Sequence, residues 1–75
     1  MEIIVVSHLN CDGYEVDGKF YYFGEADKVA ERIDLDDDVV WVKGRNVFTG
    51  NLVSDRFFET MKDNVYKAFR KQFEN

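Results

Sequence analysis

The strongest local folding signal in this chain is the pair Asp17-Gly18. It separates Tyr14–Val16 from Lys19–Phe23, two runs rich in β-branched and aromatic residues, and Asp-Gly between such runs is typical of a tight β-hairpin. Because successive side chains of a strand point to opposite sides, pairing of the residues that flank the turn assigns every side chain to a face. One face would carry Tyr14, Val16, Tyr21 and Phe23, and the other Glu15, Phe20 and Tyr22.

Other segments also have strand character. Glu2–Leu9 is β-branched and apolar, so it predicts a first strand that ends in the turn-forming sequence Asn10–Gly13. Val39–Lys43 and Asn46–Thr49 predict a second hairpin around Gly44-Arg45.

Two segments have the spacing of amphipathic helices. Glu25–Asp34 places Ala26, Val29, Ala30 and Ile33 on one stripe, which predicts a short helix. A long C-terminal helix is expected to begin after Ser54, a residue type that favours the N-cap. Its apolar positions recur every three or four residues: Phe57, Phe58, Met61, Val65, Ala68, Phe69 and Phe73.

These elements predict an α+β fold in the order β-β-β-α-β-β-α. The expected structure is a small antiparallel sheet with a short middle helix and a long C-terminal helix packed on one face. The 75 residues form a single domain, 1–75, because a core of this size cannot be divided.

The residues that usually support catalysis or metal binding are sparse. His8 is the only histidine and Cys11 the only cysteine, and the neighbouring Asp12 does not favour a reactive thiolate. A zinc site needs about four ligands. Asp34, Asp36 and Asp38 have the spacing of a calcium loop, but Val39 and Arg45 stand where that loop requires Gly and Glu. We therefore expect no enzyme activity, no metal and no cofactor.

Charge is segregated along the chain, whose net charge is −5. Residues 25–38 carry seven acids and two bases, whereas residues 39–75 carry seven bases and four acids. A protein that binds nucleic acid directly usually presents a basic surface. The net charge favours a basic protein partner instead.

The acid-rich segment is the first candidate for a partner-binding surface. Four of its acids cluster where the predicted middle helix ends, and the helix dipole disfavours anions there, so local stability does not explain them. Carboxylates one helical turn apart are spaced by ~5–6 Å, which is comparable with neighbouring phosphates of a DNA strand. The candidate residues are Glu25, Asp27, Glu31, Asp34, Asp36, Asp37 and Asp38.

In length, acidity, single cysteine and α+β pattern, with its acid-rich stretch Glu25–Asp38, the chain resembles small early proteins that phages use to disable host factors. Among such proteins it resembles the acidic phage DNA mimics that inhibit the bacterial histone-like protein HU. The resemblance implies a dimer whose carboxylates occupy the DNA-binding surface of an HU-like target. It also implies a protein that inhibits or modulates a basic nucleic-acid-binding partner and does not itself bind nucleic acid.

A secondary interface is the hairpin face with Glu15, Phe20 and Tyr22. This face would serve a binder of another host machine, such as RNA polymerase or a protease complex. Burial is the alternative for these rings, either under the second helix or in a homodimer interface. An antitoxin-like or structural oligomer partner is a third class.

The expected location is the cytoplasm, of a bacterial host cell if the chain is phage-encoded. One cysteine forms no internal disulfide, which favours a reducing compartment. The longest apolar runs are four residues, too short for a membrane helix.

Overall fold

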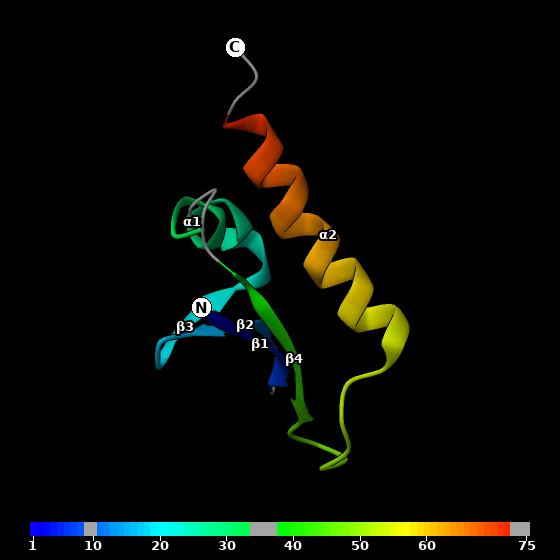
Figure 1. The fold of residues 1–75 in the computed structure, drawn as a ribbon. Coiled ribbons are helices and arrows are strands. Elements are labelled where there is room, and N and C mark those ends of the chain that lie inside the picture. The colour runs from blue at the N-terminus through cyan, green and yellow to red at the C-terminus, as the bar shows by residue number, and fades with distance from the viewer. Residues whose placement is uncertain (9–10, 34–37, 73–75) are drawn as a thin grey trace.

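The computed structural model describes residues 1–8, 11–33 and 38–72. The elements in chain order are β1 (Glu2–His8), β2 (Cys11–Val16), β3 (Lys19–Tyr22), the 3-10 turn η1 (Phe23–Glu25), α1 (Ala26–Glu31), β4 (Val40–Asn46) and α2 (Asp55–Lys71). Figure 1 shows two layers, a sheet and a pair of helices. The predicted α+β fold is confirmed, with a short middle helix and a long C-terminal helix.

The four strands of the sheet lie in the order β3-β2-β1-β4. The β1–β2 and β2–β3 pairs are antiparallel, whereas β4 lies parallel to β1. After β3 the chain passes through α1 and returns to the end of the sheet where β1 begins, so β4 runs in the same direction as β1. The sheet is therefore mixed, and the prediction of antiparallel pairing is wrong for β4.

The hairpin at Asp17-Gly18 is confirmed. Val16 pairs with Lys19, and φ is 51° at Asp17 and 81° at Gly18, as a two-residue type I′ turn requires. Tyr14, Val16 and Tyr21 are buried on one face, as expected. Phe23 does not join them and is exposed, because the strand ends at Tyr22 and Phe23 begins η1.

The predicted turn at Asn10–Gly13 is wrong for Cys11, Asp12 and Gly13, which belong to β2, while Asn10 lies outside the described residues. Cys11 pairs with His8 across the strands. The hydroxyl of Ser7 donates a hydrogen bond to Asp12 Oδ1 at 2.7 Å. This bond gives the aspartate a partner within the ladder, so a residue typical of turns is accommodated in a strand.

The predicted hairpin around Gly44-Arg45 is also wrong, because β4 continues through both residues with a shift in its register against β1. Gly44 serves close packing instead. A Cβ atom there would collide with Cγ1 of Val6 and lie 2.7 Å from the carbonyl oxygen of Val5. Glycine at this position therefore allows β4 to approach β1 closely.

The chain turns after Asn46 rather than at Gly44. The Asn46 side-chain oxygen accepts hydrogen bonds from the backbone N–H groups of Phe48 at 2.8 Å and Thr49 at 3.2 Å, a pattern by which Asn stabilises turns. The returning segment meets β4 in a single bridge, between Arg45 and Leu52. It replaces the predicted strand Asn46–Thr49.

Both helices bury the predicted apolar stripes. In α1, Ala26, Val29 and Ala30 are buried and Ile33 packs beside them. The Ser54 hydroxyl caps α2 by accepting a hydrogen bond from the Phe57 N–H at 3.2 Å. In α2 the buried residues are Phe58, Met61 and Val65, with Phe57, Ala68 and Phe69 partly buried against the core. Asp34 and Phe73 lie outside the described residues.

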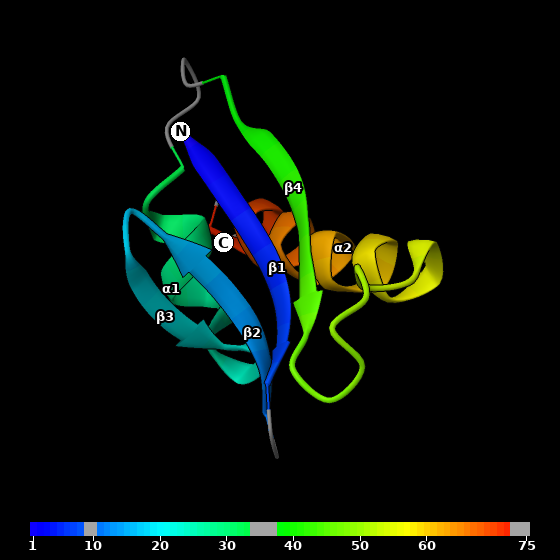
Figure 2. The same ribbon diagram turned by 90° about the horizontal axis from the view of Figure 1, so that it is seen from below.

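The core lies between the sheet and the two helices. Tyr14 is fully buried, and its hydroxyl donates to the carbonyl oxygen of Met61 in α2 at 2.6 Å. Trp41 Nε1 donates to the Tyr66 hydroxyl at 3.1 Å, which joins β4 to the same helix. In Figure 2 the sheet lies in front of both helices, so neither α1 nor α2 covers its other face.

Candidate interaction surfaces

The structure places only part of the predicted acidic surface. Glu25 pairs with Lys28, with 3.3 Å between carboxylate oxygen and ammonium nitrogen. Asp27, Glu31 and Asp38 are exposed, and the Asp38 backbone oxygen accepts a hydrogen bond from the amino terminus at 3.0 Å. Asp34, Asp36 and Asp37 lie outside the described residues.

Two of the exposed acids face bases of the other helix. A hollow of about 460 Å³ between α1 and α2 is lined by Asp27, Glu31, Asn64, Lys67, Ala68, Lys71 and Gln72. Two carboxylates and two ammonium groups therefore share one surface, and their fields partly cancel. The sequence alone does not show this arrangement, because the lysines belong to a distant segment that packs against α1 only in the folded chain.

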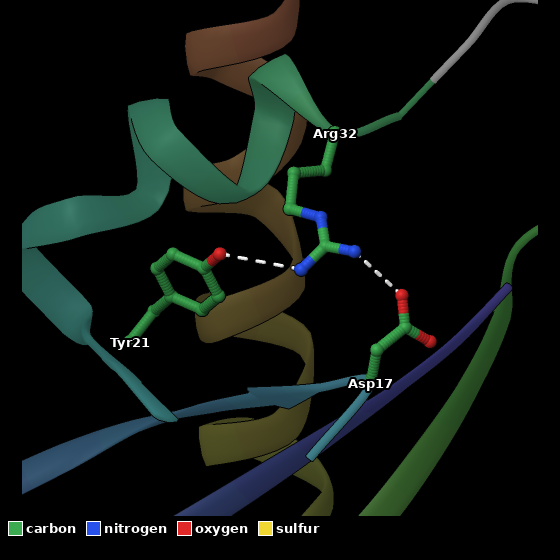
Figure 3. Close-up of polar contacts among 3 residues, drawn as sticks. All are labelled: Asp17, Tyr21 and Arg32. Atoms are coloured by element: carbon green, nitrogen blue, oxygen red, sulfur yellow. Dashed lines mark hydrogen bonds and ion pairs between the residues drawn. The ribbon is translucent and has the colours of Figure 1, made fainter. Parts of the chain in front are cut away.

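Arg32 has a structural role at the end of α1. Its guanidinium donates to the Tyr21 hydroxyl at 3.3 Å and to Asp17 Oδ2 at 2.6 Å (Figure 3). The hydrogen bond with Tyr21, together with the charge of Asp17, raises the pKa of Arg32. These contacts join α1 to the β2–β3 turn. Arg32 is one of the two bases of the acid-rich segment, and its guanidinium is thus paired within the protein.

The face of the sheet opposite the helices is the second candidate, and we call it the outer face. The strand register assigns it these residues: Glu2, Ile4, Val6, His8, Cys11, Gly13, Glu15, Phe20, Tyr22, Val40, Val42 and Gly44. Glu15, Phe20 and Tyr22 thus share this face, as the sequence predicted, and the alternative that the two rings pack under the second helix is wrong. Tyr22 and Val40 are 54% and 56% exposed, so apolar groups remain open to solvent on both edge strands.

A row of three aromatic rings crosses the outer face. The ring centroids of His8 and Phe20 are 5.0 Å apart and those of Phe20 and Tyr22 are 5.3 Å apart, both pairs with an interplanar angle of 84°. Edge-to-face pairs at such distances are favourable beyond their buried area. Gly13 provides the space, because a Cβ atom there would lie 2.5 Å from Cζ of Phe20.

The aromatic row forms one wall of a hollow of about 600 Å³. Its lining combines rings, a thiol, an aliphatic side chain and one carboxylate: His8, Cys11, Glu15, Phe20, Tyr22 and Val47. The hairpin register predicts that Glu15, Phe20 and Tyr22 lie together. The positions of His8, Cys11 and Val47 could not be predicted in the same way, because they depend on the β1–β2 pairing and on the turn after β4.

The charged residues at the paired strand positions of the outer face are both acidic. They are Glu2 and Glu15, whereas Lys19 and Lys43 pair with residues of the buried face. Arg45 lies where the β1–β4 register shifts opposite Val6, and its guanidinium donates a hydrogen bond to the carbonyl oxygen of Gly50. The face therefore combines apolar area with negative charge. This combination is complementary to an apolar surface that carries cations.

The described residues were also compared with the requirements of a metal site and of a membrane-spanning helix. Within residues 1–8, 11–33 and 38–72, no group of three or more His, Cys, Asp or Glu side chains is placed to hold a metal ion. His8 and Cys11 lie opposite each other in the β1–β2 pair and provide two ligands. Among the helices in this part of the chain, none has the length and apolarity needed to span a membrane.

Comparison of the chain with models of protein families, with curated proteins and with solved structures found no match. The resemblance to phage DNA mimics therefore stays a prediction.

Proposed function

We propose that this chain is a non-catalytic binding protein that contacts a basic protein partner through the outer face of its sheet. The observation that carries the proposal is the aromatic row His8, Phe20 and Tyr22, which lies beside the carboxylate of Glu15 on a face that neither helix covers.

Exposed aromatic area supports the proposal energetically. Burial of apolar surface stabilises a complex by roughly 25 cal/mol per Å² before the cost of association is subtracted. Tyrosine is enriched among the residues that contribute most to binding energy. Tyr22 is half exposed at an edge strand, so a partner can cover its ring without unfolding any element.

The net charge of −5 supports a basic partner. Opposite charges accelerate association and exclude partners of like charge. The two acids of the outer face, Glu2 and Glu15, extend this preference to the contact surface itself.

The mimicry of DNA by the acid-rich segment is the second candidate function. It is favoured by the net charge of −5 within residues 25–38 and by the exposure of Asp27, Glu31 and Asp38. In this function the partner is a basic nucleic-acid-binding protein, and DNA competes for the same surface. Lys67 and Lys71 beside Asp27 and Glu31 weaken the likeness to a phosphate backbone, so we place it second.

The proposed function is tested with a matched pair of aromatic substitutions. Tyr22 lies on the outer face, whereas Phe23 is similarly exposed, 58% against 54%, but begins η1. Partners are captured from a bacterial lysate, identified by mass spectrometry and titrated by calorimetry. Tyr22→Ser should weaken binding about tenfold, equivalent to ~1.4 kcal/mol, and Phe23→Ser should leave it within about twofold. Equal affinities for wild type and Tyr22→Ser would overturn the proposal.

A further inference from the structure

We propose that the hollow on the outer face receives an arginine side chain of the partner. This inference rests on the proposed function and specifies the chemistry of its contact.

The hollow combines the two groups that bind a guanidinium. Glu15 supplies a carboxylate, which accepts charge-assisted hydrogen bonds from the fork of guanidinium N–H groups. Phe20 lies directly opposite Glu15 in the β2–β3 register, and Tyr22 follows two residues later on the same face. Aromatic rings attract a cation and stack on the planar guanidinium. The carboxylate and both rings line the same hollow.

The carboxylate of Glu15 is available for such a partner. The ion pairs of the described residues join Lys28 to Glu25, Arg32 to Asp17 and Lys43 to Asp55. In this part of the chain, therefore, no Lys or Arg side chain neutralises Glu15. Glu15 is only half-buried, so a cationic side chain can reach its carboxylate from solvent. The aliphatic stem of that cationic side chain can then contact the rings.

The apolar lining of the hollow also favours a side chain with an apolar stem. The thiol of Cys11 and the side chain of Val47 complete its wall. Arginine covers apolar surface with its methylene groups and keeps its charge at the end. The hollow can thus contact the stem along the rings and the guanidinium at Glu15.

A second copy of the same chain fits this face less well. Face-to-face contact of two outer faces would bring together the carboxylates of Glu2 and Glu15 from each copy. Opposed like charges disfavour an interface. Charge complementarity therefore favours a cationic partner.

The probe for this inference is the peptide acetyl-Leu-Arg-Leu-amide, titrated into ¹⁵N-labelled protein. The control peptide replaces arginine with citrulline, which keeps the shape and removes the charge. The arginine peptide should shift the amide resonances of residues that line the hollow and approach saturation at millimolar concentration. The citrulline peptide should bind roughly two- to fivefold more weakly, as expected for the loss of one exposed ion pair.

Two protein variants locate the contact. Glu15→Gln should reduce affinity for the arginine peptide roughly two- to fivefold and remove its advantage over the citrulline peptide. Glu59→Gln removes an exposed acid of α2, outside both candidate surfaces, and should preserve that advantage. Spectra of the free variants that match wild type outside the substituted positions establish that both fold.

Three results would overturn the inference. The arginine peptide could shift no resonances in the hollow, its advantage could survive in Glu15→Gln, or the same resonances could shift on dilution of the protein alone. The last result would identify a second copy as the occupant. The proposed function has a separate readout, because loss of partner binding in Tyr22→Ser supports the outer face even if the arginine peptide does not bind.

Discussion

Tyr14 allows a test of the core in which the stability difference between wild type and Tyr14→Phe depends on pH. The side chain is fully buried between sheet and helices, and its hydroxyl donates to the Met61 carbonyl at 2.6 Å. Burial raises the pKa of Tyr14 to about 12, compared with about 10 in an unfolded chain. Because the folded protein disfavours the phenolate, this contribution to stability is complete below pH 10 and is lost as pH rises toward 12.

The expected magnitudes follow from these two pKa values. By about pH 11 the unfolded state has released close to one more proton equivalent than the folded state, and the wild-type protein has lost about 1.4 kcal/mol. At neutral pH, Tyr14→Phe should cost about 1 kcal/mol, since it removes one buried hydrogen bond. Because the variant has no phenol at position 14, it does not lose this free energy of unfolding at alkaline pH. The two proteins should therefore become about equally stable near pH 11.

The measurement is urea unfolding of both proteins at several values between neutral pH and pH 11. All other side chains are the same in the two proteins, so the difference between the two unfolding free energies isolates Tyr14. A difference that stays constant across the whole pH range would contradict the buried, protonated phenol.

Ser54→Ala should lower the free energy of unfolding by about 1 kcal/mol in urea titration, because the N-cap of α2 loses its acceptor; an unchanged midpoint would count against the cap. Gly44→Ala should destabilise the protein by roughly 1–3 kcal/mol through overlap with Val6. Gly24→Ala, whose added Cβ meets no atom within 4 Å, is the control and should change stability by less than about 0.5 kcal/mol. Equal effects of the two substitutions would show that β4 does not approach β1 closely. Sedimentation over a hundredfold range of concentration tests the homodimer that was predicted from the sequence. If the outer face binds a cationic partner instead, the protein alone should keep a constant mass of 8.8 kDa. A larger mass at high concentration would favour the dimer.

The sequence predicted correctly those elements that are determined by residues close together in the chain. The positive φ values at Asp17 and Gly18 are what an Asp-Gly turn provides, so the hairpin and the faces of its two strands followed from the residues. The same holds for α2, whose cap and apolar spacing are contained within one segment.

The errors arose where distant contacts decide the structure. Gly44 resembles a turn residue in sequence, but its missing side chain accommodates Val6 from a strand almost forty positions earlier. The same limit applies to the candidate sites. The hairpin register placed Glu15, Phe20 and Tyr22 together, whereas the lysines beside Asp27 and Glu31 come from packing between two helices.

The most direct test of the central claim is one calorimetric comparison against the captured partner. It ranks Tyr22→Ser on the outer face against a variant in which Asp34, Asp36, Asp37 and Asp38 are replaced by Asn. The proposed function predicts that the single substitution weakens binding about tenfold and that the four substitutions have a smaller effect, largely on the association rate. The opposite ranking, with near-normal affinity for Tyr22→Ser and loss of binding in the four-Asn variant, would contradict it and support mimicry of DNA.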